Sequence, residues 1–525
     1  MSLDKSLEKS NENENQFRPD AFYRAPGHFL MEEIQALPYS DIPSALTLAL
    51  QKLELVNRLH IDIAHREDAV RPFNFAWRKF HHYYAELRTT QKYVRQADST
   101  ELDQLGKFTR SLSYGYQLAI EGLLGVENQH SQKAQLFFNA IFYIGQAMLQ
   151  SYARYSWTEP GLWQQLHHLY RSAELEKCEE IAVSTPLDSA SKQSSKQLYA
   201  AITLLSVADP YHMQQGDVWL LQRYLTKWCH LIEVTAPDLQ QLPEFCFCVN
   251  LYSQVRAFPL SSLKNYTQDG LRWIFVDKIE EQVKHHLNLI RNGHSSSILG
   301  LDEILPPAKS LDLLERALVC WAYTPSRQTS RFAESDPVGI VWTLNDIFRL
   351  LDANSRKDVE EKKQKLQLHH KAWGNTENSS ESGVRVHIKQ FADIGLSVGE
   401  VVGLLRNTAT GQQLQIGIVQ WTAQGESEQM LRCGIQFISG TPRAALVDLE
   451  SHEMGVRYAI LLVQENATSE APNTLILPTG IASIGDRLLV STPDVSDAFE
   501  IIPNKVLLHS DQIDHCSFET VNELV

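Results

Sequence analysis

Cysteine pairs at the CxxC spacing are missing from this 525-residue chain. Its seven cysteines are scattered and odd in number, and no pair has the CxxC spacing of redox or zinc motifs. Only Cys246 and Cys248 lie close together, and the apolar residues around them indicate a core element. We therefore predict reduced thiols in a reducing compartment, which is typical of a cytoplasmic protein.

Long apolar runs and an excess of basic residues are also missing. No uninterrupted apolar stretch approaches the roughly 18 residues that a membrane span needs, and the polar N-terminal segment has no apolar core typical of a signal peptide. The net charge of −15 opposes non-specific binding to a nucleic acid polymer or to an acidic membrane surface. We expect a cytoplasmic globular protein without a membrane span.

Motifs of common catalytic sites are absent as well: HExxH, GxSxG, GxxxxGK[ST] and GxGxxG do not occur. Adjacent histidines recur, as in His81-His82 and His285-His286. On a helix such neighbours point about 100° apart and chelate a metal poorly. The sequence therefore predicts no enzyme, no metal site and no cofactor. An enzyme whose site no motif reveals stays open as a weaker alternative.

The chain does contain a long region with helical periodicity. Residues 1–38 are rich in Asn, Glu and Ser, which predicts a disordered tail. Residues 39–322 repeat apolar residues at helical spacing between breakers such as Pro160-Gly161, which predicts an all-α domain. Its aromatic segment, Phe73 to Leu87, has the spacing of a helix that buries one broad face.

Strand periodicity begins after residue 383. Val384-Arg-Val-His-Ile-Lys alternates strictly, and three further β-like segments follow at 398–405, 414–421 and 431–438. Turn clusters separate these segments, which indicates a small antiparallel barrel or sandwich. Residues 352–383 end in the polar stretch Gly374 to Gly383, which we interpret as a loop or linker.

Two arginines, Arg327 and Arg331, stand four residues apart just before a strand-like run, Asp336 to Trp342. Far downstream come Gly417-Ile-Val-Gln-Trp421 and Gly434-Ile-Gln-Phe437. Together these segments resemble the PilZ family of cyclic di-GMP receptors, in which an Arg-x-x-x-Arg loop precedes a small barrel with a Gly-x-Val-x-Trp and Gly-x-x-Phe strand pair. The family's (Asp/Asn)-x-Ser-x-x-Gly turn is altered here, because Gln390 and Ala392 replace its two polar residues and only Gly395 is kept.

The resemblance implies a multidomain α + β protein. A long all-α N-terminal domain, residues 39–322, would be followed by a PilZ-like antiparallel β-barrel, residues 323–450, that carries an insertion or linker at 343–383. The insertion would begin with a helix at Leu344. A β-rich C-terminal extension, residues 451–525, would complete the chain.

The resemblance also implies a ligand and its contacts. Cyclic di-GMP would be bound by Arg327, Arg331, Gln390 and Gly395. Arginine suits this dianion because its planar fork bonds phosphate oxygens and the guanine edge and stacks on bases. Loss of the serine contact at Ala392 would cost about 0.5–1.5 kcal/mol. The protein would be a non-enzymatic signalling protein whose helical domain binds an unknown protein partner. The alternative is a helical scaffold or adaptor whose β domains mediate only protein contacts.

Overall fold

A computed structural model describes residues 25–89, 99–159, 161–238, 243–263, 268–301, 304–322, 330–355, 368–389, 396–408, 411–424, 430–449, 456–464, 472–493 and 498–522. These residues divide into two compact units. Unit 1 comprises the described residues up to Met148 together with Gly161–Tyr199 and Asn250–Val255. Unit 2 comprises Leu149–Pro160, Ala200–Val249 and the described residues from Arg256 onward. Each unit is described by itself.

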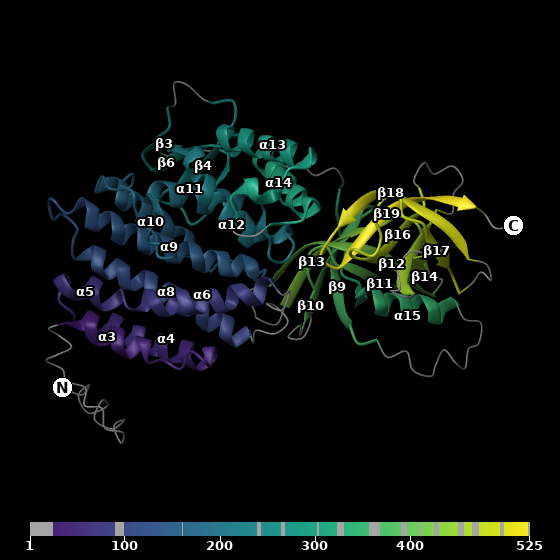
Figure 1. The fold of residues 1–525 in the computed structure, drawn as a ribbon, viewed down its shortest axis with the longest axis horizontal. Coiled ribbons are helices and arrows are strands. Elements are labelled where there is room, and N and C mark those ends of the chain that lie inside the picture. The colour runs from purple at the N-terminus through teal and green to yellow at the C-terminus, as the bar shows by residue number, and fades with distance from the viewer. Residues whose placement is uncertain are drawn as a thin grey trace, which may run out of the picture. The chain divides into compact units, whose positions relative to one another are not determined.

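Unit 1 is built mainly from helices (Figure 1), with one short hairpin of β1 (Val183–Ser184) and β2 (Lys192–Gln193). The helices are α3 (Pro26–Gln35), α4 (Ile42–Arg58), α5 (Ile63–Val70), α6 (Phe73–Thr89), α8 (Ser99–Glu121), most of α9 (His130–Ala153) and α10 (Leu162–Leu175). The side chain of Asp41 caps α4 by accepting a hydrogen bond from the Ser44 amide. On α6, Phe73, Trp77 and Phe80 are fully buried, which confirms the predicted aromatic face.

Helix α3 corrects one expectation. The composition of residues 1–38 predicts a disordered tail, yet Pro26–Gln35 is helical. Its Pro26 occupies the first turn, where a missing amide hydrogen costs nothing. Leu30 and Ile34 lie one turn apart and are buried, so contacts with other helices stabilise a segment too short to be helical alone. Residues 1–24 lie outside the described part of the chain.

The helical part of unit 2 contains most of α11 (Ser195–Val207), α12 (Asp217–Trp228), α13 (Asp277–Arg291), α14 (Pro307–Ala322) and the short 3-10 helix η1 (Pro210–His212). The structure adds a four-stranded sheet that the helical pattern does not reveal. Its strands run in the order β3 (Glu233–Thr235), β6 (Leu271–Phe275), β4 (Phe247–Asn250) and β5 (Phe258–Pro259). Cys246 and Cys248 are buried against Trp273 in its core, as their apolar neighbours predict. None of the described helices combines the length and apolar character needed to cross a membrane.

Two antiparallel barrels follow the helices, which confirms the predicted fold class. In barrel 1 the strand order is β10 (Gly383–Lys389), β13 (Met430–Phe437), β12 (Gly411–Gln424), β11 (Val401–Thr408), β8 (Pro337–Trp342) and β9 (Lys371–Ser380). Pairing of β9 with β10 closes the ring, and the short β7 (Phe332–Ala333) is added along β9. Its interior is apolar and includes Val338, Val386 and Ile435.

Strand β9 corrects a second expectation, because the polar stretch from Gly374 is predicted to be a loop or linker. Most of it is a strand paired with β8 on one side and β10 on the other. Its composition gives no local strand signal. Gly374 is nevertheless required there, since a Cβ at this position would lie 2.4 Å from the backbone oxygen of His387. Neighbouring strands, and not side-chain preference, make this segment extended.

The predicted insertion does begin with a helix, α15 (Leu344–Ser355). Its Ile347 and Phe348 share an apolar core with outward-facing residues of both barrels, such as Leu405 and Ile460. Barrel 2 closes in the order β14 (Thr441–Leu449), β15 (Arg457–Val463), β16 (Thr474–Pro478), β19 (Ile513–Asn522), β18 (Phe499–His509) and β17 (Leu488–Ser491). Helix α15 therefore joins the two barrels into one packed body (Figure 1).

Candidate functional site

A row of paired residues crosses five strands of barrel 1, from β7 to β12. The Cα partners in this row are Ala333, Asn378, Arg385, Gly434 and Trp421. The residues on either side of Arg385, Val384 and Val386, point into the barrel core. Because side chains alternate along a strand, the row lies on the outer surface of the barrel.

On this surface three charged or ionisable side chains lie close to a single carboxylate, and one of them also lies over an aromatic ring. We call the set the Trp421 face and define it as Glu377, Arg385, His387, Trp421 and Arg432. The bulge that follows Arg385 in the pairing of β10 with β9 leaves Glu377 as an extra residue on β9. The face therefore brings together residues from four strands.

Trp421 is held by its neighbours on both sides. Its indole covers Gly434, where an added Cβ would lie only 2.0 Å from Nε1. The guanidinium of Arg385 lies over the ring at 5.3 Å from the centroid. A cation above an aromatic face is attracted by the ring's negative charge density. The absence of a side chain at Gly434 thus allows Trp421 and Arg385 to meet across the strand between them.

The carboxylate of Glu377 lies close to three other side chains of the face. Arg432 Nε lies 2.9 Å from its carboxylate, while Arg385 and His387 are each 3.7 Å away. Two guanidinium groups against one carboxylate leave an excess positive charge beside an aromatic ring. All of these side chains are partly exposed. Such a surface can accept an anion that also carries a flat ring.

His212 of η1 stands beside this face. Its ring centroid is 6.3 Å from that of Trp421, and its Nδ1 is 2.9 Å from Asp209. Arg316 on α14 donates a hydrogen bond of 3.3 Å to the His212 carbonyl. The helical part of unit 2 therefore touches the barrel at the aromatic residue of the face.

Three of the four ligand-contact residues expected from the sequence, Arg327, Gln390 and Gly395, lie outside the described residues. Arg331 is described and is exposed, two residues before Ala333. Strand β7 begins at the next residue, and two strand spacings of about 5 Å each separate β7 from β10.

The described neighbours of the two expected ligand segments, Phe332 and Lys389, are paired near opposite ends of β10. Phe332, next to Arg331, pairs with Ser379 at the turn between β9 and β10. Lys389, next to Gln390, is paired with Met430 at the far end of β10, six residues from Gly383. Six residues of strand span about 20 Å. The Trp421 face occupies the space between these ends, and convergence of the expected contacts stays a prediction.

Arg385 and Arg432 were not predicted as ligand contacts from the sequence, although one signal for Arg385 is present. The alternation of Val384-Arg-Val-His-Ile-Lys puts Arg385 and His387 on one face opposite the apolar residues. Nothing local indicates that Arg432 and Glu377 join them, because these residues come from other strands. The expected strand pair itself is present, since Gly417 pairs with Phe437 and Trp421 with Gly434.

Among the described residues we find no metal site, and the two cysteines of the barrels are not reactive thiols. No group of three histidine, cysteine or acidic side chains among them is arranged to hold a metal ion. Burial raises the pKa of the Cys433 thiol to about 12 and that of Cys516 to about 11. These cysteines remain protonated near neutral pH and are unreactive packing residues.

Comparison with known proteins finds one family. Residues 30–238 match the family described as cyclic-di-GMP receptor FimW, N-terminal domain. The match begins in α3 and ends just after β3, so it covers helical elements of both units and neither barrel. No curated protein matches the chain.

Proposed function

We propose that this protein is a non-enzymatic cyclic di-GMP receptor that binds the nucleotide on the outer surface of barrel 1. The observation that carries the proposal is the similarity of residues 30–238 to the N-terminal domain of a cyclic di-GMP receptor, FimW. The Trp421 face of barrel 1 supports the proposal independently, because it offers guanidinium groups for phosphates and an aromatic ring for stacking on a base.

The proposed ligand fits the face chemically. Cyclic di-GMP is a dianion with two guanine rings. Arg385 and Arg432 supply guanidinium groups for its phosphates, and Trp421 supplies a surface for stacking. We place the expected contacts of Arg327 and Arg331 at one end of the face and those of Gln390 and Gly395 at the other. In this proposal the barrel is PilZ-like, with an altered ligand turn.

The helical region would carry the signal to a protein partner. His212 lies against Trp421, and the η1 segment that contains it leads directly into α12. A ligand on the Trp421 face would therefore change the surroundings of the helical part of unit 2. If the nucleotide does not bind, the protein is better explained as a helical scaffold whose β domains mediate only protein contacts.

Isothermal titration calorimetry tests the proposal. The wild-type protein should release or absorb heat with cyclic di-GMP, and both Arg327→Ala/Arg331→Ala and Arg385→Ala should weaken binding by roughly tenfold or more. Arg487→Ala is the matched control, because Arg487 forms an exposed ion pair with Glu500 on barrel 2. No heat from the wild type at about 100 μM ligand, a concentration well above the Kd expected of a receptor, would overturn the proposal.

A further inference from the structure

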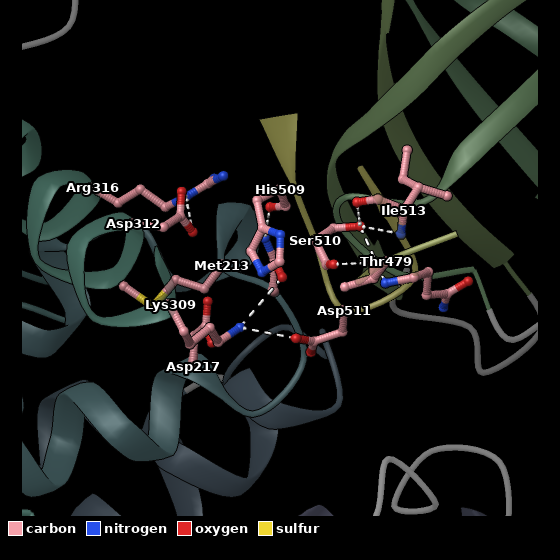
Figure 2. A network of polar contacts seen from close by, with 12 residues as sticks. Met213, Asp217, Lys309, Asp312, Arg316, Thr479, His509, Ser510, Asp511 and Ile513 are labelled. Carbon is pink, nitrogen blue, oxygen red and sulfur yellow. Dashed lines mark hydrogen bonds and ion pairs between the residues drawn. The ribbon is translucent and has the colours of Figure 1, made fainter. Parts of the chain in front are cut away.

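A buried charge cluster connects the helices of unit 2 to barrel 2 (Figure 2). The ammonium group of Lys309 on α14 lies 2.6 Å from Asp217, a fully buried residue at the start of α12. The same ammonium lies 3.5 Å from Asp511, in the turn between β18 and β19. Lys309 is largely buried. Its ion pairs with the two carboxylates are therefore less screened by water than ion pairs on the surface.

Gln214 reinforces this connection. Its side-chain amide donates a hydrogen bond of 3.0 Å to the His509 carbonyl, and its oxygen accepts one of 3.3 Å from Lys309. His509 and Asp511 flank Ser510, whose hydroxyl closes the same turn by accepting a hydrogen bond from the Ile513 amide (Figure 2). Hydrogen bonds within barrel 2 and polar contacts from Gln214 and Lys309 therefore fix the conformation of this turn.

Gly399 of barrel 1 packs against the same turn between β18 and β19. This residue has a φ of +85°, and a Cβ added to it would lie 2.9 Å from Cβ of Ser510 and 3.6 Å from the side chain of Gln214. Only glycine combines that backbone conformation with such a close approach. Gly399 is thus the point at which barrel 1 packs against both the turn and the helical part.

Backbone hydrogen bonds also connect the segment at Gly399 to β12, the strand that carries Trp421. The Gly399 amide donates to the Val419 carbonyl at 2.8 Å, and the Val419 amide donates to the Glu400 carbonyl at 3.0 Å. Val419 lies two residues before Trp421 on β12. At the end of the same strand, the Gln424 amide donates to the Tyr155 carbonyl at 2.7 Å.

From these contacts we infer that Gly399, Gln214 and Lys309 are positioning residues that couple the Trp421 face of barrel 1 to helices α12 and α14. The inference rests on the proposed function for the nature of the ligand. Ligand on the face shifts β12, the shift reaches Gly399 through Val419, and Gly399 acts on the turn and on Gln214. The buried ion pair of Asp217 with Lys309 holds α12 and α14 to that turn. The coupling residues touch no ligand themselves.

The decisive comparison uses two glycine variants. Gly399→Ala introduces both backbone strain and a clash with Ser510, whereas Gly293→Ala introduces strain alone, because Gly293 has the same φ of +85° with nothing within 4 Å of its Cβ position. Hydrogen exchange followed by mass spectrometry is measured on α12 and α14 with and without saturating cyclic di-GMP, and the affinity is measured by calorimetry.

In the wild type and in Gly293→Ala, the ligand should slow exchange in α12 and α14. In Gly399→Ala that protection should be lost and the affinity should fall about fivefold or more, the usual lower range of a coupling effect. Equal behaviour of the two variants, or helices that do not respond to ligand in the wild type, would overturn the coupling while leaving the proposed function intact.

If the wild type does not bind cyclic di-GMP, the proposed function fails and the link is judged without ligand. The variant Lys309→Met should then speed hydrogen exchange of β12 peptides relative to the wild type, with Lys284→Met as the control on an exposed helical lysine. Faster exchange in Lys309→Met alone supports the mechanical link between the helices and barrel 1. Unchanged exchange of β12 overturns it.

Discussion

The indole of Trp421 lies directly over Gly434 on the adjacent strand, so closely that a methyl group at Gly434 would overlap Nε1 at 2.0 Å. The two residues are Cα partners in the pairing of β12 with β13. Arg385 is the partner of Gly434 on its other side and reaches over it to the same ring. A single glycine therefore sets the geometry of the cationic and aromatic surface of barrel 1.

Replacing that glycine should displace the tryptophan. Gly434→Ala is expected to lower the free energy of unfolding by roughly 1–3 kcal/mol, because the indole must leave its place to accommodate the methyl group. Urea denaturation measures the change. The double variant Trp421→Ala/Gly434→Ala should be clearly more stable than the sum of the single effects predicts. Additive effects would mean that the two side chains do not compete for the same space.

Neutralising Glu377 should strengthen ligand binding. Its carboxylate holds Arg432 at 2.9 Å and lies near Arg385, so it competes with a ligand phosphate for the same cations. We expect Glu377→Gln to raise the affinity for cyclic di-GMP about threefold, measured by calorimetry at low salt. Glu500→Gln is the control, because it removes a similarly shielded carboxylate that pairs with an arginine on barrel 2. A weaker affinity in Glu377→Gln would show that the carboxylate orients the arginines instead of competing for them.

Removing Lys309 should destabilise the protein, and more so at higher pH. Burial raises the pKa of Asp217 to about 6, and the ammonium of Lys309 opposes that rise. Without the lysine the pKa rises further above its value in the unfolded chain, so the folded state binds the proton more tightly and stability falls as the pH increases from about 4. Lys309→Met should cost about 3–5 kcal/mol near pH 8 and less near pH 5.

The matched rescue is Asp217→Leu/Lys309→Met, in which no buried charge is left alone. This double variant should recover most of the lost free energy of unfolding and should not show the added pH dependence. Urea denaturation of the wild type, Lys309→Met, Asp217→Leu and the double variant at pH 5 and pH 8 completes the cycle. A cost for Lys309→Met that does not change with pH would contradict a charged Asp217 in the folded state.

A buried histidine makes unit 1 sensitive to acid. Burial lowers the pKa of His167 to about 4, and its Nδ1 and Nε2 bond the Tyr199 hydroxyl and the Val255 carbonyl at 2.7 and 2.9 Å. Because the unfolded histidine titrates near pH 6.5, its stabilising contribution is present above that pH and is lost as the pH falls toward 4. At pH 5 the loss amounts to about 2 kcal/mol.

Urea denaturation at pH 7 and pH 5 measures this effect. His167→Gln should be less stable than the wild type at pH 7 but should lose less stability on acidification, by about 2 kcal/mol. The neighbouring exposed residue provides the control, since His168→Gln should keep the pH dependence of the wild type. If both variants follow the wild type, His167 does not carry the acid response.

The sequence by itself determined the class and order of the elements. Helical spacing around Phe73 and strict alternation from Val384 predict a buried helix face and a strand, because both patterns record locally which side of an element is covered. This reasoning failed at α3 and β9, where contacts with distant parts of the chain outweigh a composition that suggests disorder or a linker.

Only the tertiary structure decided which side chains meet. Glu377, Arg385, Trp421 and Arg432 come from four strands, and their meeting depends on strand order and on one bulge. Lys309 and Asp511 are far apart in the sequence and share one charge cluster. Periodicity cannot reveal such pairs, since it reports burial along one element and carries no information on the partner across the fold. Arg327 and Arg331 could be singled out only together with the strand-like run after them and the downstream segments Gly417–Trp421 and Gly434–Phe437. The surface that these arginines are proposed to serve is created by the closure of barrel 1.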